Sequence, residues 1–334
     1  MKLKKLALAL FFISVNEAIA AEKSLITLPI TPVTGNPLGV GSDQMVVPIS
    51  ILNGRELSLK RENTIAETLN SVPGVSNSSF GPSVGRPMIR GMDSDRIRIL
   101  QNGVNSIDAS NLSFDHAVAI DPLIIEQIDV IRGPATLLYG GGAVGGVINA
   151  IDHRIPKEKL QGITGRGEIR YGGANLEQSQ AAVIDVGTGN FVMHLDAYHR
   201  DGKNYRIPGN AVSNRLQSTQ TWDPDTNPVG DVKEGSYTPY STDHGRRKLL
   251  NSQSETKGGA IGASMIFDKG FAGFSYAKHQ SAYGSVKEPG VHLDMDRDRY
   301  DFSSELKDLN TFFDRAKFKV AYTDYQHHEK EGSE

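Results

Sequence analysis

The chain has no cysteine among its 334 residues. Disulfide scaffolds, zinc ribbons, cysteine-ligated iron–sulfur clusters and cysteine nucleophiles are therefore excluded. An excess of charge is also lacking, because 36 Lys and Arg against 39 Asp and Glu leave a formal net charge of −3. That balance argues against a protein that wraps nucleic acid by charge, and we expect no nucleic-acid partner.

Long hydrophobic runs are lacking too. Three lysines near the N-terminus precede an apolar run over residues 6–15, which is too short to span a bilayer as a helix. Residues 18–20 (Ala-Ile-Ala) then have the small-x-small pattern of a signal peptidase site. This order predicts a signal peptide over residues 1–20. An exported chain without a membrane helix is periplasmic, secreted or an outer-membrane β-barrel.

Glycine is abundant, with 35 residues in the chain, and shows no collagen period. Such a content suits many strands and tight turns. After about residue 160, segments of about ten residues alternate in hydrophobicity. Residues 191–197 and 316–323, for example, place apolar side chains on one face and polar ones on the other.

The connections between these segments are of two kinds. Residues 187–190 and 268–270 are short turns, whereas residues 204–253 and 280–296 are predicted as long polar loops. Short turns at one end and long loops at the other favour a transmembrane β-barrel. A soluble β-sandwich, whose strands also alternate, is the alternative.

Residues 42–153 mix helix and strand patterns. Thr64 and Glu67 form a capping box at a helix start, and residues 87–91 and 96–100 predict strands. Residues 140–145 satisfy G-x-G-x-x-G, but the sequence continues as a strand, and an exported chain has no access to dinucleotide pools. We expect these glycines to allow close backbone packing instead.

Two groups of histidines bear on metal binding. Asp115 and His116 lie in a polar loop, where a carboxylate and an imidazole can ligate a divalent metal, although a solvated loop is the alternative. His327 and His328 are adjacent, so both can bind one metal only if the strand has ended there. The spacing gives no Ser-His-Asp set and no paired carboxylates, and we expect no enzyme activity.

Residues 21–41 are predicted as a tether. Residues 28–37 alternate apolar and polar side chains and contain three prolines, which block helix and central-strand ladders. An extended segment that pairs as an added edge strand fits this pattern, and a disordered linker is the alternative.

Four motifs together resemble the TonB-dependent outer-membrane receptors. They are residues 87–91 (PMIRG), 128–134 (IDVIRGP), 138–140 (LYG) and 145–149 (GGVIN). The resemblance implies a mixed α+β plug domain over residues 42–153, followed by antiparallel transmembrane β-barrel strands over residues 160–334. It implies a location in the Gram-negative outer membrane, in contact with its lipid.

The resemblance also implies partners. The tether would be a TonB box that pairs with periplasmic TonB and so with its inner-membrane energising complex. The contact residues that the resemblance implies are Ile26, Leu28, Ile30 and Val33. The ligand would be a transported metal or metal chelate, with no cofactor.

Finer features point to one branch of that family. Residues 113–122, 149–156 and 326–332 look like the zinc-uptake receptors, in which a plug Asp-His pair that matches Asp115 and His116 takes part in zinc binding. Relatives carry a His/Asp-rich external loop, and residues 287–296 here have one histidine. Haem or ferric-siderophore uptake is therefore the alternative. A secreted all-β adhesin or carbohydrate-binding protein is the rival from another class.

Length sets a further expectation. Outer-membrane transporters of this type close with 22 strands, which need roughly 220 residues before any loops. Only 174 residues follow residue 160. We therefore expect the signal peptide, the plug and an incomplete 22-stranded barrel, which alone would not form a working pore.

Overall fold

The computed structural model describes residues 49–211, 246–286, 290–309 and 313–331. The predicted signal peptide and tether lie outside the described residues, and so do Ile26, Leu28, Ile30 and Val33. Within the described ranges, no helix is long and apolar enough to cross a membrane.

The first domain contains a five-stranded sheet in the order β1-β6-β7-β4-β5. Its strands are β1 (Ile49–Asn53), β4 (Ile97–Gln101), β5 (Val104–Asn105), β6 (Gln127–Ile131) and β7 (Gly146–Ile151). All neighbours are antiparallel except β4 and β7. A hairpin of β2 (Val75–Ser79) and β3 (Gly85–Ile89) packs against α3 (Ile65–Thr68), and α2 (Gly54–Lys60) packs against β1. Short 3-10 helices connect them at Ser94–Arg96, Ala109–Asn111, Pro122–Ile124, Pro134–Tyr139 and Gly141–Ala143.

The core of this domain lies between the helices and the sheet. Leu57, Ile65 and Leu69 are buried in one cluster with Ile128 and Ile148 of the central strands. The expected capping box is confirmed, because the Thr64 hydroxyl accepts a hydrogen bond from the backbone N–H of Glu67 at 3.1 Å. That bond satisfies one of the free donors at the start of α3.

The expected close packing is confirmed at Gly145, whereas a Cβ on Gly140 or Gly141 would meet no atom within 4 Å. A Cβ on Gly145 would lie 2.9 Å from Cβ of Met92 and 3.1 Å from the carbonyl oxygen of Arg96. Gly146 opens β7 at φ 150°, against the side chain of Ile89. Only residues without a side chain allow the backbone to pass this closely.

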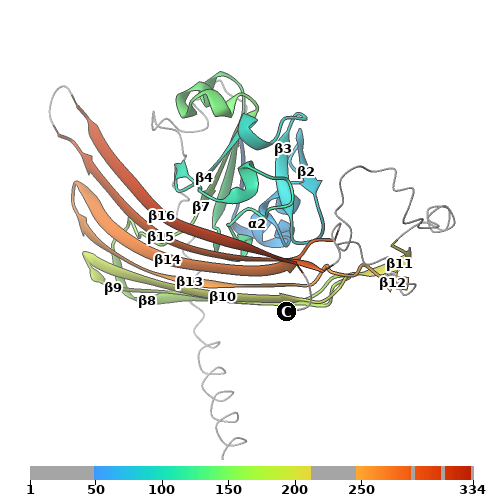
Figure 1. Cartoon of the computed structure of the whole chain (residues 1–334). Helices are drawn as coiled ribbons and strands as arrows, with labels where there is room; N and C mark the ends of the chain where they lie inside the picture. Colours follow the sequence, from blue (N-terminus) through green and yellow to red (C-terminus); the bar gives the residue numbers. More distant parts are fainter. Residues whose placement is uncertain (1–48, 212–245, 287–289, 310–312, 332–334) are drawn as a thin grey trace, which may run out of the picture. The chain divides into compact units, whose positions relative to one another are not determined.

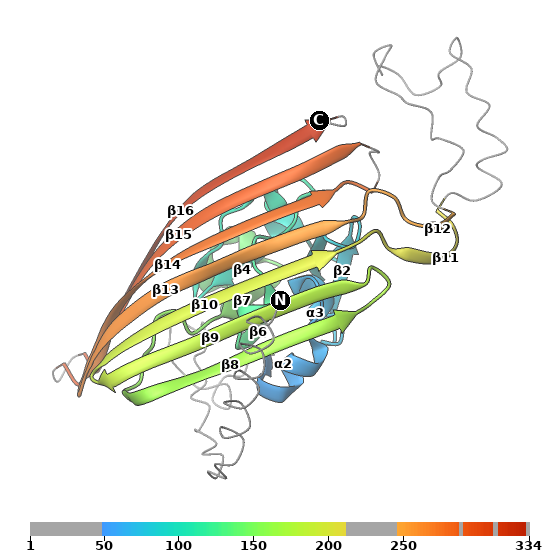
Figure 2. The same ribbon diagram turned by 90° about the horizontal axis from the view of Figure 1, so that it is seen from below.

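The second part of the chain is an antiparallel sheet of seven strands in the order β16-β15-β14-β13-β10-β9-β8, here called the strand wall. Its strands are β8 (Leu160–Gly172), β9 (Glu177–Gly189), β10 (Phe191–Gly202), β13 (Ser254–Phe267), β14 (Gly270–Gly284), β15 (Val291–Lys307) and β16 (Arg315–Glu331). The wall curves along one side of the first domain (Figure 1), and its strands lie side by side in Figure 2. β11 (Arg206–Asn210) and β12 (Arg246–Lys248) pair separately.

The wall has two ends and two faces. The turns at residues 190 and 268–269 define its turn end, and the segments 203–253 and 285–290 define its loop end. On β10, Val192, His194 and Asp196 are buried toward the first domain, whereas Phe191 and Met193 are exposed on the outward face. The predicted alternation and the predicted fold class are therefore confirmed.

The long loop predicted over residues 280–296 is wrong. β14 continues to Gly284 and β15 begins at Val291. The inward residues Tyr283, Leu293 and Met295 are apolar and buried. Most outward residues beside them, such as Gln280, Asp294 and Asp296, are polar, so hydrophobicity does not distinguish these strand ends from a loop.

Candidate ligand site at the loop end of the first domain

Asp115 and His116 lie together in the segment that joins the 3-10 helices at Ala109–Asn111 and Pro122–Ile124. Oδ1 of Asp115 lies 3.0 Å from Nδ1 of His116 and also accepts a hydrogen bond from the Ser113 hydroxyl. Burial would raise the pKa of the Asp115 carboxyl, but these hydrogen bonds outweigh it and hold the pKa below its usual value. The carboxylate is therefore charged at neutral pH.

The other ring nitrogen of His116 is the unusual atom of this site. The residue is 8% exposed, and its Nε2 is buried without a hydrogen-bond partner among the described residues. When Nδ1 donates to a carboxylate, the neutral ring carries its free electron pair on Nε2. That arrangement is typical of metal-binding histidines, whose second nitrogen is held by a carboxylate.

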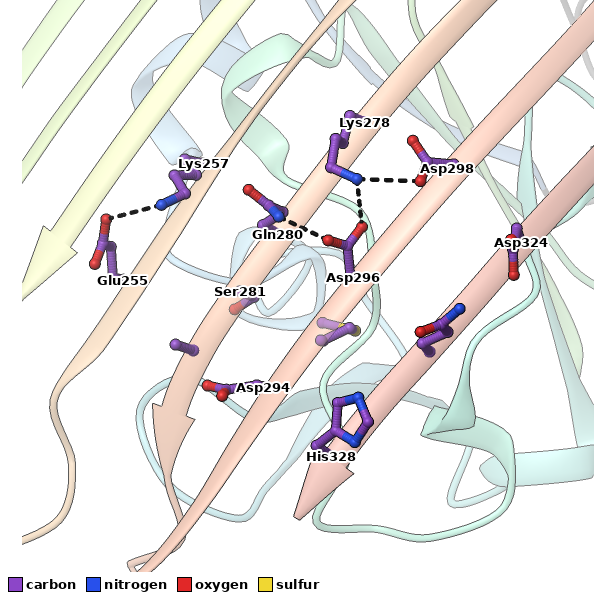
Figure 3. Close-up of a pocket in the computed structure, with 13 residues that line it drawn as sticks. Glu255, Lys257, Lys278, Gln280, Ser281, Asp294, Asp296, Asp298, Asp324 and His328 are labelled. Atoms are coloured by element: carbon purple, nitrogen blue, oxygen red, sulfur yellow. Dashed lines mark hydrogen bonds and ion pairs between the residues drawn. The ribbon is translucent and has the colours of Figure 1, made fainter. Parts of the chain in front are cut away.

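A second histidine reaches this place from the strand wall. The ring of His327, on β16, lies 4.7 Å from the ring of His116 between centroids, at 82° between planes. Because β16 continues to Glu331, His327 and His328 point to opposite faces. His328 lines a cleft on the outward side instead, as Figure 3 shows. The strand has not ended, so the two histidines cannot share one metal.

The sequence contained a signal for His327 that depended on strand length. Thr323 and Tyr325 continue the inward face of β16, and His327 is the next residue on that face. Had β16 been known to reach beyond residue 327, the period of two would have placed His327 toward the first domain.

An apolar cluster seats this segment of the first domain against the wall. Ala117 and Ala119 pack with Tyr283, Leu293 and Met295 of β14 and β15. The hydroxyl of Tyr283 also accepts a hydrogen bond from the backbone N–H of Ala117 at 2.9 Å. These contacts fix the backbone immediately after His116.

Two aromatic rings lie close to the same segment. Phe80 and Phe114 pack edge to face with centroids 5.0 Å apart, and Phe114 is 51% exposed. Among the residues that the structure describes, no group of three or more His, Cys, Asp or Glu side chains is arranged to hold a metal ion. The described part of the site thus supplies a few candidate ligands and an apolar border, not a closed metal cage.

Buried polar contacts hold the first domain on the wall below this site. Nη2 of Arg200, on β10, lies 3.1 Å from Oδ1 of Asp121. Arg297, on β15, donates to the hydroxyl of Ser106 at 3.2 Å and to Oε1 of Gln101 at 3.1 Å. A mutation that removes one partner of such a pair would leave the other polar side chain buried without its hydrogen bond.

Comparison with known proteins identifies the first domain. Residues 43–147 match the TonB-dependent receptor plug domain. The vitamin B12 transporter BtuB of Photobacterium profundum is 32% identical over 154 residues, which cover 46% of this chain and 25% of BtuB. The hemin receptor of Yersinia pestis is 32% identical over 117 residues, covering 34% of this chain and 17% of that receptor. The chain thus spans a quarter or less of the length of these two curated relatives.

Solved structures with the same fold are transporters as well. The copper transporter OprC has a TM-score of 0.63 at 17% identity, over 84% of this chain and 37% of OprC. The FrpB iron transporter from Neisseria meningitidis has a TM-score of 0.60 at 13% identity, over 84% of this chain and 41% of FrpB. At these identities the likeness shows the fold alone, a plug domain beside β-barrel strands.

Proposed function

We propose that this chain, which carries the plug domain of the TonB-dependent receptors, serves the energised uptake of zinc across the Gram-negative outer membrane. The names of its relatives support a location in the outer membrane and a role in nutrient uptake. One of them is a ferrichrome outer membrane transporter of Escherichia coli, 28% identical over 130 residues. No covalent chemistry is required. The ligand is bound from outside and released inward when the plug rearranges.

The observation that carries the choice of zinc is Nε2 of His116. A buried imidazole nitrogen without a partner costs free energy unless a ligand or water completes it. Its Nδ1 is held by the Asp115 carboxylate, and a second imidazole, that of His327, lies beside it. Neutral imidazoles and carboxylates are common ligands of Zn²⁺.

The roles can be assigned atom by atom. His116 would bind zinc through Nε2. Asp115 would hold and orient this ring through Oδ1, because a carboxylate bonded to Nδ1 does not reach an ion on Nε2 of the same ring. His327 would add a second ligand from the wall. Water or another part of the receptor would supply the remaining ligands of a tetrahedral site.

Energy would enter through the tether. Ile26, Leu28, Ile30 and Val33 would pair as an added strand with periplasmic TonB, which is driven by its inner-membrane complex. The domain boundaries proposed with this mechanism are a signal peptide over residues 1–20, a tether over 21–41, a plug over 42–153 and barrel strands from residue 160.

Haem uptake is the second candidate. It is favoured by the exposed Phe114, which packs on Phe80 and lies two residues before His116, whose Nε2 has no hydrogen-bond partner among the described residues. An aromatic surface next to an imidazole suits a flat apolar metal chelate. The likeness to a hemin receptor points the same way.

Zinc titration into the receptor purified from outer membranes tests the assignment. His116→Ala and His327→Ala should each weaken zinc binding at least tenfold, which corresponds to about 1.4 kcal/mol. His328→Ala is the matched control, since it removes the same side chain from the opposite face of the same strand, and it should leave the affinity unchanged. Equal zinc affinity in wild type and His116→Ala would refute zinc at this site. Haem binding that is lost in His116→Ala would then identify the second candidate.

A further inference from the structure

The outward face of the strand wall changes character at a row of tyrosines. Tyr276, Tyr300 and Tyr322 lie opposite one another on β14, β15 and β16. Their ring centroids are 5.0 Å apart between Tyr276 and Tyr300 and 6.2 Å apart between Tyr300 and Tyr322. The tyrosines form a continuous border across three strands.

Toward the turn end from this border, the outward residues are apolar. The next row across the wall consists of Ile163, Val186, Met193, Ala263, Phe274, Phe302 and Val320. Tyrosines at the edge of an apolar band mark the boundary between hydrocarbon and polar head groups in membrane barrels. We therefore take the tyrosine row as the outer limit of the hydrocarbon layer.

Toward the loop end from this border, the outward residues of β13, β14, β15 and β16 become polar. Lys278, Asp298 and Asp324 form the first row, and Lys257, Gln280, Asp296 and Gln326 form the second. Same-face residues repeat about every 6.6 Å along a strand, so these two polar rows extend roughly 13 Å beyond the tyrosines. This part of the wall lies at the height of the membrane's outer polar layer.

A cleft of about 510 Å³ occupies this polar face, lined by side chains of β13, β14, β15 and β16 (Figure 3). Nζ of Lys278 lies 2.8 Å from Asp296 and 3.1 Å from Asp298. Nε2 of Gln280 donates to Asp296 at 2.6 Å, and the hydroxyl of Tyr276 donates to Asp298 at 2.5 Å. The polar groups at the floor of the cleft are thus fixed before any ligand arrives.

The charge of the cleft indicates which chemical groups of the membrane's polar layer, phosphates or sugars, it can bind. Its lining has five carboxylates and two lysines. Head-group phosphates bind to basic pockets, so the acidic excess disfavours them. Sugar hydroxyls donate hydrogen bonds to carboxylates and accept them from amide and ammonium groups, and the lining offers all three.

We propose that this outward cleft binds the core sugars of the glycolipid in the outer leaflet. The proposal goes beyond the uptake function and rests on the outer-membrane location alone. The apolar band below the tyrosines contacts the acyl chains, and the cleft directly beyond it receives the sugars of the same lipid. Bound glycolipid fixes the height of the wall in the membrane.

The test measures binding of lipopolysaccharide with core sugars to the receptor purified from outer membranes in detergent, by native mass spectrometry. The double variant Gln280→Ala with Asp296→Ala should weaken this binding at least fivefold. Gln180→Ala is the matched control, because Gln180 is outward and exposed and lies in the same cross-strand row, but on β9 outside the cleft. It should bind as the wild type does.

Three results would overturn the proposal. The first is equal binding in the double variant and the wild type. The second is binding of lipid A without core sugars, or competition by inorganic phosphate, as strong as that of the complete glycolipid, since the ligand would then be the phosphate. The third is a receptor dimer that the double variant dissociates, since the cleft would then contact a second copy. None of these readouts involves zinc, so failure here leaves the proposed uptake function untouched.

Discussion

Gly262 lies on β13 where the segment that leaves the first domain crosses the wall. A Cβ at this position would overlap the carbonyl oxygen of Arg154. That backbone cannot easily move, because the Arg154 guanidinium donates to both carboxylate oxygens of Asp196 at 2.8 and 3.2 Å. The sequence indicated that glycines serve close packing, but which glycine meets which backbone depends on the tertiary arrangement.

We expect Gly262→Ala to destabilise the protein by about 1–3 kcal/mol, the usual cost of overpacking. Gly167→Ala on β8 is the control, because a Cβ there meets only an ordinary contact at 3.9 Å. The measurement is the temperature at which the detergent-purified protein loses its folded mobility on a gel. A Gly262→Ala transition equal to that of the control would contradict the packing argument.

At the scale of single elements, the sequence predicted the interior of each strand better than its end. The alternation of β16 is evident from Phe318 to Tyr322, where the outward side is apolar. Beyond Tyr322 the outward side chains Asp324 and His328 are polar, so hydrophobicity no longer distinguishes strand from loop. The pair Asp115 and His116 could be named from the chemistry of its side chains and was strengthened by the resemblance, whereas placing His327 beside it required the length of β16.

The β4–β5 hairpin gives a prediction at this scale. Gln101 connects two elements, because its Nε2 donates to Asp152 at 2.9 Å and its Oε1 accepts from Arg297. Gln101→Leu would leave two buried charged groups each short of a partner, at a cost of about 2–4 kcal/mol. Hydrogen exchange should accelerate across residues 97–105. Gln180→Leu, an exposed change of the same kind, should leave these amides protected, and equal protection in both variants would refute the role of Gln101.

The tether gives a second prediction at this scale. An added strand binds its partner through backbone hydrogen bonds. A proline, which lacks the backbone N–H, should therefore weaken the contact with TonB more than a smaller side chain does. Ile30→Pro in the receptor expressed from its own gene should abolish uptake of the ligand while its binding stays intact. Ile30→Ala is the comparison and should retain most uptake. Normal uptake in Ile30→Pro would remove this segment from the mechanism.

On the scale of the whole molecule, the motifs predicted the fold class, but they did not predict how the plug packs against the wall. At Gly145 of the plug, the glycine allows a close backbone approach that a side chain would block. The interface between plug and wall includes, besides an apolar cluster, buried polar pairs such as Arg200 with Asp121, which lie 79 residues apart in the chain. A single sequence contains no pattern that connects such partners.

Asp152, where the plug passes into the wall, makes this assembly sensitive to acid. Burial would raise the pKa of its carboxyl, but the charge of Arg154 and hydrogen bonds from Gln101 and Asn102 outweigh burial and lower the pKa. A lowered folded pKa stabilises the protein above the unfolded value near 3.9, and this contribution is lost as pH falls through the folded pKa.

Asp152→Asn should therefore reduce stability at pH 7 by about 1.5–3 kcal/mol, the worth of a hydrogen bond to a charged group. The difference between wild type and variant should shrink as the pH falls from 5 toward 2, because the wild-type carboxyl then becomes neutral as well. Denaturant unfolding of both proteins across this range measures it. A difference that stays constant from pH 7 to pH 2 would mean that the charge of Asp152 does not hold the plug to the wall.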